Sequence, residues 1–157
     1  MRKKLNQRTT LDKTDFQILA TLQEDSHLSY RKLAAKMGIS SVIAAARIKN
    51  LEAKGFLKGY SAILDPPMLG YDLTAVIFVQ VEGVFIKNLE NAFSQMPNAV
   101  AVYEITGDFD VVAVIKLKDR EALNMLIKDL LVTPHIKKTM TNITLNVVKE
   151  DFRLKLP

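Results

Sequence analysis

The side chains best suited to recognition chemistry lie close together between positions 40 and 50. This segment carries two hydroxyls, one amide and two positive charges, which belong to Ser40, Ser41, Asn50, Arg47 and Lys49. Hydroxyls and amides can hydrogen-bond the edges of bases, whereas guanidinium and ammonium groups bind phosphate oxygens and set position. The remaining candidates for base contact are apolar and could meet thymine methyl groups: Val42, Ala45 and Ala46. The segment is therefore a candidate for contact with duplex DNA.

These residues belong to a stretch, residues 33–57, whose pattern predicts a helix, a four-residue turn and a second helix. Gly38 can leave the first helix in a left-handed conformation, Ser40 can cap the second helix, and Gly55 can end it. One face of the second helix is apolar at spacings i, i+4 and i+7, with Ala44, Ile48 and Leu51; the opposite face carries Val42, Ala46, Lys49 and Ala53. A helix-turn-helix inserts such a helix into the DNA major groove, but an ordinary helical hairpin has the same spacing.

The positive charge of the chain is concentrated in the same region. The 157 residues have a formal net charge of +5; residues 1–65 contain 12 Lys and Arg against 6 Asp and Glu, and residues 66–157 contain 10 against 11. Because neutralisation of phosphates supplies most non-specific affinity for nucleic acids, this surplus indicates double-stranded DNA as the partner. A solvated basic face would have the same composition, so charge alone does not decide.

Several other kinds of chemistry are not supported. The absence of cysteine excludes disulfides, thiolate catalysis and cysteine metal sites. No serine or threonine has a histidine spaced to act as its base, and Glu104, Asp108 and Asp110 lack further metal-ligand spacing. We therefore expect no catalytic residue, no metal and no cofactor. Charged residues interrupt every apolar run before the ~18 residues of a membrane span, and the basic start has no apolar run after it, so a cytoplasmic protein without membrane contact is expected.

The order of patterns along the chain predicts two folded domains. Asp12 can cap a helix that runs to about Glu24, and Ser29 can cap the next helix. Loose alternation over 56–64 indicates a short wing or a linking strand, and Asp65-Pro66-Pro67 with Gly70 a stiff connector. The predicted segments are a flexible basic arm at 1–10, a winged helix-turn-helix at 11–60, a linker strand at 61–72, an effector-binding and oligomerisation domain at 73–150 and a tail at 151–157.

The second domain is predicted to have the strand and helix order βαββαβ. The expected strands are 74–81, 99–106, 109–117 and 139–148. One expected helix carries its apolar stripe over 86–96, and the other is capped by Asp119 and ends near Pro134. This is the ferredoxin-like arrangement, in which both helices cover one side of an antiparallel sheet, and the whole chain is of the α+β class.

Two strands of that sheet are apolar on both faces. In the first strand Ile77 faces one side and Phe78 the other, and the hairpin strand repeats this with Ala113 and Val114. The two helices can cover only one face, so we expect the sheet of a second subunit to cover the other and form an isologous homodimer. A wrong register or a few tolerated surface valines are the alternative.

In its ordered set of short motifs the chain resembles the Lrp/AsnC family, the leucine- and asparagine-responsive (feast/famine) transcription regulators. The resemblance extends from Leu11 to about Glu150. The motif residues are Leu11-Asp12, Asp15, Ile18-Leu19, Leu33-Ala34, Gly38-Ile39-Ser40, Arg47-Ile48, Leu51-Glu52, Gly55, Gly59-Tyr60, Leu64-Asp65, Leu69-Gly70 and Thr106-Gly107-Asp108-Phe109-Asp110.

This resemblance implies a winged helix-turn-helix joined to a ligand-sensing domain, with an amino acid or related small molecule as effector. It also implies dimers that often assemble into octamers, with effector pockets between dimers. Carried over by motif position, the effector-binding residues are Gly107, Asp108, Asp110, Thr139 and Thr141. Carboxylates, hydroxyls and loop amides are suited to an amino acid, but a plain hairpin turn also explains glycine and aspartate at 107–108.

The chain departs from the family pattern in the helix that would read DNA, because residues 41–46 offer almost no hydrogen-bonding group. Base reading would depend on methyl contacts, on Ser41, Lys49 and Asn50, and on DNA shape, so strong salt dependence and modest base discrimination are expected. This keeps open an oligomeric small-molecule-binding protein with weak or lost DNA reading. A third reading is an enzyme, since some tetrapyrrole decarboxylases share this two-domain fold, but the second domain has only one histidine, His135.

Overall fold

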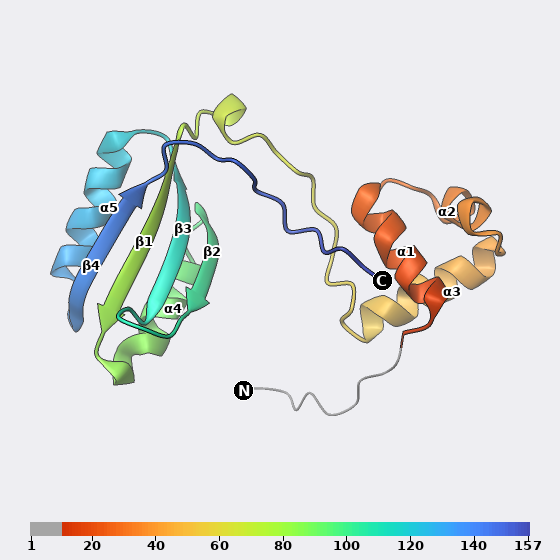
Figure 1. Cartoon of the computed structure of the whole chain (residues 1–157), viewed down its shortest axis with the longest axis horizontal. Coiled ribbons are helices and arrows are strands. Elements are labelled where there is room, and N and C mark those ends of the chain that lie inside the picture. Colours follow the sequence, from red (N-terminus) through yellow and green to blue (C-terminus); the bar gives the residue numbers. More distant parts are fainter. Residues whose placement is uncertain (1–10) are drawn as a thin grey trace. The chain divides into compact units, whose positions relative to one another are not determined.

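The computed structural model of the chain describes residues 11–157 (Figure 1). These residues divide into two compact units, one formed by residues 11–62 together with 151–157 and the other by residues 63–150. The predicted basic arm, residues 1–10, lies outside the described residues.

The N-terminal unit is built from three short helices. They are α1 (Lys13–Glu24), α2 (Tyr30–Met37) and α3 (Ser41–Ala53). The side chains of Asp12, Ser29 and Ser40 each accept a backbone N–H three residues later, which confirms the caps expected from the sequence. Gly38 ends α2 with φ +66°, a conformation that glycine adopts without a steric penalty. The small core of this unit consists of Ile18, Leu22, Leu33, Ala34, Ala44, Ile48 and Leu51.

The segment after α3 differs from its prediction. Residues 54–72 contain no strand, so neither a two-stranded wing nor the predicted linker strand over 61–72 forms. Three glycines and two prolines interrupt the alternation in this segment, and proline cannot donate to a strand ladder. The one regular element is a 3-10 turn, η1 (Pro67–Leu69), directly after Asp65-Pro66.

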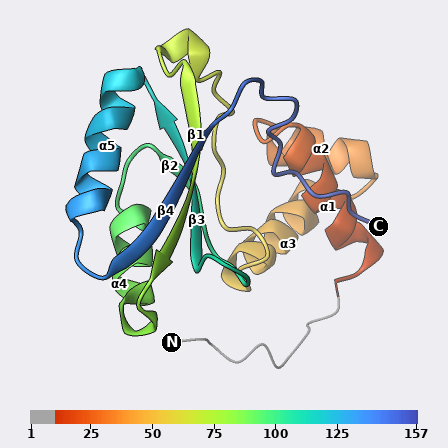
Figure 2. The same cartoon turned by 60° about the vertical axis from the view of Figure 1, so that its left-hand side comes forward.

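The C-terminal unit has the predicted βαββαβ order, with one added 3-10 turn. Its elements are β1 (Leu73–Val81), η2 (Gly83–Phe85), α4 (Ile86–Ser94), β2 (Ala99–Glu104), β3 (Val111–Leu117), α5 (Arg120–Val132) and β4 (Ile136–Ile143). The strands form an antiparallel sheet in the order β2-β3-β1-β4, with α4 and α5 on the same side (Figures 1 and 2). Phe93, fully buried, is the largest side chain of the core between the helices and the sheet.

The last strand ends earlier than predicted, at Ile143 rather than at position 148. The Thr144 backbone N–H donates to the Thr74 carbonyl at the start of β1, which fixes the end of the ladder, and the chain then leaves the sheet. The ammonium of Lys116 on β3 lies 2.7 Å from the carboxylate of Glu150, which ties this outgoing segment to the C-terminal unit.

The final residues of the chain contact the N-terminal unit, to which they belong. The Gln23 side chain on α1 makes two hydrogen bonds to the backbone of Leu154, one from its amide nitrogen at 3.0 Å and one to its oxygen at 2.8 Å. A glutamine amide thereby substitutes for the strand partner that the extended tail lacks.

One face of the sheet carries no helix, and we call it the open sheet face. It consists of alternate residues of all four strands, and its apolar members are half-buried or exposed: Val76, Phe78, Ala101, Tyr103, Val112, Val114 and Met140. The ring of Phe109 packs 5.7 Å from that of Phe78, measured between centroids, and adds a third aromatic group to this face beside Phe78 and Tyr103. The predicted apolar character of both faces is therefore confirmed.

Candidate nucleic-acid interface and effector loop

Helix α3 presents an apolar surface to solvent at its N-terminal end. Its inner face is buried, with Ala44, Ile48 and Leu51 each at most 1% exposed. At 100° per residue the residues opposite this core are Val42, Ala46, Lys49 and Ala53, which we call the outer stripe of α3. All four are exposed, and Val42 is 77% exposed. Because most of its side chain is in solvent, Val42 contributes little to the hydrophobic core of the N-terminal unit.

The other residues predicted to contact DNA surround this stripe in different ways. Ser41 and Asn50 are exposed and Ala45 is half-buried, so all three can reach a partner. The Ser40 hydroxyl already accepts the Ile43 backbone N–H at 3.2 Å, so its first role is to begin the helix. Apart from Ser40, which precedes the helix, and Arg47, the predicted residues lie on or beside the outer stripe of α3, with Lys49 in the stripe and Ser41 and Asn50 at its margins.

Further positive charges stand on α2, which sequence reasoning did not single out. Arg31, Lys32 and Lys36 are exposed, as is Lys49 on α3, and none of the four makes an ion pair with any residue from 11 to 157. Residues 26–51 contain no Asp or Glu at all. The signal was present in the sequence as this acid-free window. In a helix-turn-helix the first helix crosses the DNA backbone, where unpaired cations bind phosphates.

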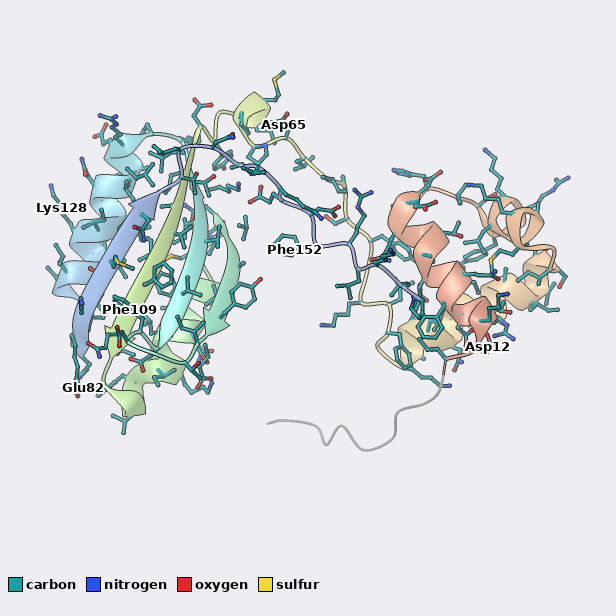
Figure 3. The ribbon with its side chains drawn as sticks, in the orientation of Figure 1. Asp12, Asp65, Glu82, Phe109, Lys128 and Phe152 are labelled. Carbon is teal, nitrogen blue, oxygen red and sulfur yellow. The ribbon has the colours of Figure 1, made fainter. Side chains whose placement is uncertain are left out.

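Arg47, predicted to contact phosphate, is occupied within the protein. Its guanidinium donates to Asp12 at 2.7 Å and to Asp15 at 2.8 Å, the two carboxylates of the α1 capping box. Asp12 is labelled at the start of α1 in Figure 3. Hydrogen bonds from the Asp15 backbone and from Arg47 lower the pKa of Asp12, and the same carboxylates raise the pKa of Arg47. Arg47 therefore fixes α3 against the start of α1, and its predicted phosphate contact stays a prediction.

A second tether joins α3 to the segment that follows it. The Tyr60 hydroxyl donates to the Glu52 carboxylate at 3.1 Å. Partial burial, and then the nearby negative charge of Glu52, raise the pKa of Tyr60 to about 12, so the phenol stays protonated and can keep donating. The C-terminal end of α3 is held in this way without a wing strand.

The predicted effector loop is a tight turn between β2 and β3. Gly107 has φ +116°, a region that side-chain-bearing residues rarely adopt, and Asp108 is exposed at the tip. The Asp110 carboxylate accepts the Val81 backbone N–H at 2.8 Å, and the Asp110 N–H donates to the Val79 carbonyl at 3.0 Å. Asp110 therefore anchors the loop to the end of β1, whereas the Asp108 side chain is exposed to solvent.

The two threonines of the predicted effector site lie on the edge strand β4. Thr139 is paired with Val79 and Thr141 with Ile77, so both half-buried side chains face the helix side of the sheet. Asp110 also bonds Val79, but from the opposite edge of β1. Within one chain β1 separates the loop from the threonines by about two strand spacings, or about 10 Å.

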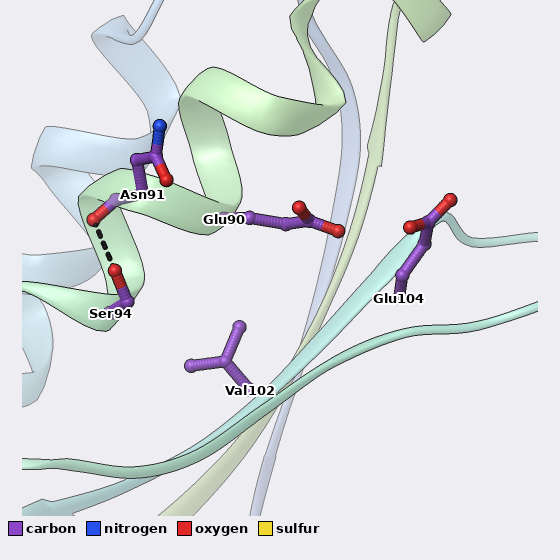
Figure 4. Close-up of a pocket in the computed structure, with 5 residues that line it drawn as sticks. All are labelled: Glu90, Asn91, Ser94, Val102 and Glu104. Carbon is purple, nitrogen blue, oxygen red and sulfur yellow. Dashed lines mark hydrogen bonds between the residues drawn. The ribbon is translucent and has the colours of Figure 1, made fainter. Parts of the chain in front are cut away.

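A shallow hollow elsewhere on the C-terminal unit does not include any predicted site residue. It is lined by Glu90, Asn91 and Ser94 of α4 and by Val102 and Glu104 of β2 (Figure 4). The ammonium of Lys87 lies 2.6 Å from Glu90 and 3.3 Å from Glu104, so a cation of the protein already neutralises the two carboxylates that line it.

The described residues show neither a metal-binding group nor a membrane-spanning helix. Within the described range no group of three or more His, Asp or Glu side chains is arranged to hold a metal ion. In the same range no helix has the length and apolar character needed to cross a membrane.

Comparison with known proteins extends over both units. Residues 11–58 match a winged helix-turn-helix DNA-binding domain and residues 74–154 match the Lrp/AsnC ligand binding domain. An uncharacterised HTH-type transcriptional regulator of Pyrococcus furiosus is 37% identical over 92% of this chain and 98% of its own length. The HTH-type transcriptional regulator FL11 of Pyrococcus horikoshii is 33% identical over 95% of this chain and 99% of its own length.

Solved structures agree with these matches. A transcriptional regulator of Neisseria meningitidis, crystallised as its complex with L-Met, superposes with a TM-score of 0.84 at 27% identity, over 93% of this chain and 97% of the other. An AsnC family transcriptional regulator of Agrobacterium tumefaciens also has a TM-score of 0.84, at 26% identity over 92% and 97% of the two chains.

Proposed function

Since the chain belongs to the Lrp/AsnC family of transcriptional regulators, we propose that it grips duplex DNA with α2 and α3 and that a small amino-acid-like effector modulates this binding or the assembly of the protein. The observation that carries the proposal is the exposed helix α3 beside cations on α2 that have no acidic partner among the described residues, in a window of 26 residues without an acid. Such a surface favours a polyanion over any neutral or basic partner. No catalytic step is assigned to the chain.

The effector site proposed for the C-terminal unit consists of Gly107, Asp108, Asp110, Thr139 and Thr141. The Asp108 carboxylate would accept from an ammonium group, and the threonine hydroxyls and loop amides would serve a carboxylate. The related Neisseria regulator with L-Met supports an amino acid as ligand. Because β1 stands between the loop and the threonines, a second chain would have to complete a site of amino-acid size.

The open sheet face supports a homodimer as the basic assembly. It carries Phe78, Val112 and Val114 in the middle strands and Tyr103 and Met140 at the edges, the last two 51% and 41% exposed. Two such faces related by a twofold axis would bury one another, because an isologous contact places the same patch on both subunits. Association of dimers into an octamer would then bring effector loops of different dimers together.

The first experiment is a titration of the full chain against a duplex from upstream of its own gene. Fluorescence anisotropy is recorded at low salt with each of the twenty amino acids in turn. We expect submicromolar binding and a change in affinity with at least one amino acid. Asp108→Ala should abolish that change, and the matched variant Asp129→Ala, an exposed aspartate on α5, should leave it intact.

Two results would count against the proposal. Absence of binding to this and to unrelated duplexes at low salt would remove the DNA-binding part. Binding that no amino acid changes, in affinity or in oligomeric state, would remove the effector part.

One observation favours a second candidate function, an oligomeric ligand-binding protein with weak DNA reading. The outer stripe of α3 offers only Lys49 as a hydrogen-bonding group. If binding to the upstream duplex and to a scrambled duplex of equal length differed by less than about tenfold, against the 10³ or more of a specific regulator, this candidate would be preferred.

A further inference from the structure

The surface of α3 indicates what kind of base it can read. We propose that the outer stripe recognises the C5-methyl groups of thymine, so that A·T pairs face Val42 and Ala46 in the preferred sites. This inference rests on the proposed DNA binding and deepens it by naming the chemical group that is recognised.

The first ground is the exposure of apolar carbon where base contacts are made. In helix-turn-helix proteins the N-terminal residues of the second helix contact base edges. Here Val42 is 77% exposed and Ile43 beside it 49% exposed, and Ala46 is exposed one turn later. These side chains bring methyl groups and no donor or acceptor to the groove.

The second ground is the chemistry of the major groove. Guanine, adenine and cytosine present only donors and acceptors there, whereas thymine presents one acceptor and one methyl group. An apolar side chain against a polar edge leaves that edge without a partner, which costs binding energy. Against the thymine methyl the same side chain gains apolar contact, so thymine is the one base that this surface favours.

The third ground is spacing and charge. Val42 and Ala46 are four residues apart, which is about 6 Å along a helix, close to two base-pair steps. Lys49 follows one turn later, and on α2 Arg31, Lys32 and Lys36 make no ion pair within residues 11–157. An apolar stripe with cations on either side fits the major groove, where methyl groups lie on the floor and phosphates line the edges. An apolar protein partner would offer these cations no anion to bind.

The test uses four duplexes of equal length and charge, measured with the full chain at low salt. The first is an alternating A·T duplex, and the second replaces thymine by uracil, which lacks the methyl group. The third is an alternating G·C duplex, and the fourth replaces cytosine by 5-methylcytosine, which places a methyl group in the same groove. The two pairs separate the effect of the methyl group from that of base-pair type and DNA shape.

Burial of one methyl group corresponds to about a fourfold change in affinity, so two contacts should give about fifteenfold tighter binding to each methylated duplex. Val42→Ala should reduce both ratios toward one. The matched control Val132→Ala, at a valine 79% exposed on α5, should leave all four affinities unchanged. Lys49→Gln should weaken binding to all four duplexes by one common factor and leave the ratios intact.

The outcomes separate this inference from the proposed function. Equal affinity within each pair of duplexes would overturn the methyl inference and leave DNA binding standing. Ratios that Val42→Ala does not change would also overturn it, since the methyl effect would then arise elsewhere. No binding to any of the four duplexes would overturn both.

Discussion

The outer stripe of α3 and the open sheet face are both apolar and accessible to solvent, and they differ in what surrounds them. The outer stripe of α3 is narrow and lies among cations that have no acidic partner in the described chain. The open sheet face is broad, is built from valines and aromatic rings, and belongs to a part of the chain that is nearly neutral in charge. Hydrophobicity alone would not distinguish the two surfaces.

We infer from this difference that the charges around an apolar surface select its partner. A surface without net charge gains by meeting a copy of itself, because like charges do not oppose the contact. A surface among unpaired cations would repel its own copy and attract a polyanion. We therefore propose that the sheet self-associates and that α3 binds DNA, and four changes test this division.

The largest effect is expected from a charge placed on the open sheet face. Val114→Glu would bury two uncompensated carboxylates in a symmetric dimer, at several kcal/mol each, and should raise the dimer dissociation constant at least about a thousandfold. Sedimentation equilibrium measures the change. Val132→Glu, on the exposed face of α5, is the control and should leave the mass unaltered. If Val114→Glu retained the wild-type mass at micromolar concentration, the sheet would not be the interface.

The next largest effect is expected from salt concentration, which should change DNA binding by α3 but not association through the sheet. If the four unpaired cations each bind a phosphate, affinity for duplex DNA should fall about a hundredfold between 50 and 200 mM salt, whereas apolar association of the sheets should hardly change. Anisotropy titrations and sedimentation at the same salt concentrations provide both readouts. A shallow salt dependence of DNA binding would contradict the role given to α2.

A pair of matched variants distinguishes the two cations of α3. Arg47→Met removes both contacts to the α1 cap and should lower the melting temperature by about 3–5 °C while the salt slope of DNA binding stays the same. Lys49→Met should leave the melting temperature unchanged. It should reduce the slope of log affinity against log salt concentration by about one, which corresponds to one lost phosphate contact. If instead Arg47→Met reduced the salt slope and left the melting temperature unchanged, Arg47 would make the phosphate contact that the sequence predicted.

The smallest effect is expected in the stability of the fold at acid pH. Asp12 accepts the Asp15 backbone N–H and the Arg47 guanidinium, and both lower its pKa below the ordinary 3.8. A carboxyl with a lowered folded pKa stabilises the fold above its unfolded pKa and loses that contribution as the pH falls through the folded value. Asp12→Asn should therefore reduce the pH dependence of thermal unfolding below about pH 4. Asp129→Asn serves as control and should leave this dependence at its wild-type size.

Much of the fold could be predicted because it depends on local signals. Asp12, Ser29 and Ser40 each provide a capping oxygen in the residue type itself, and the period of the apolar residues separates helices from strands. The same signals placed the βαββαβ order and the apolar second face of the sheet. They failed where two local signals compete, as in residues 56–72, where glycines and prolines cancel a weak alternation.

The sequence by itself determined the element order, the charge asymmetry and the apolar outer stripe of α3, because each is a property of residue type and spacing. Only the tertiary structure decided which polar groups remain available. Arg47 and Lys49 are two residues apart and equally cationic, yet packing of α3 on α1 places one guanidinium between two carboxylates and leaves the other cation in solvent. Asp108 and Asp110 divide in the same way, since the register of β3 on β1 brings only Asp110 to a backbone N–H. Such pairings depend on residues distant in the chain, and no local pattern contains them.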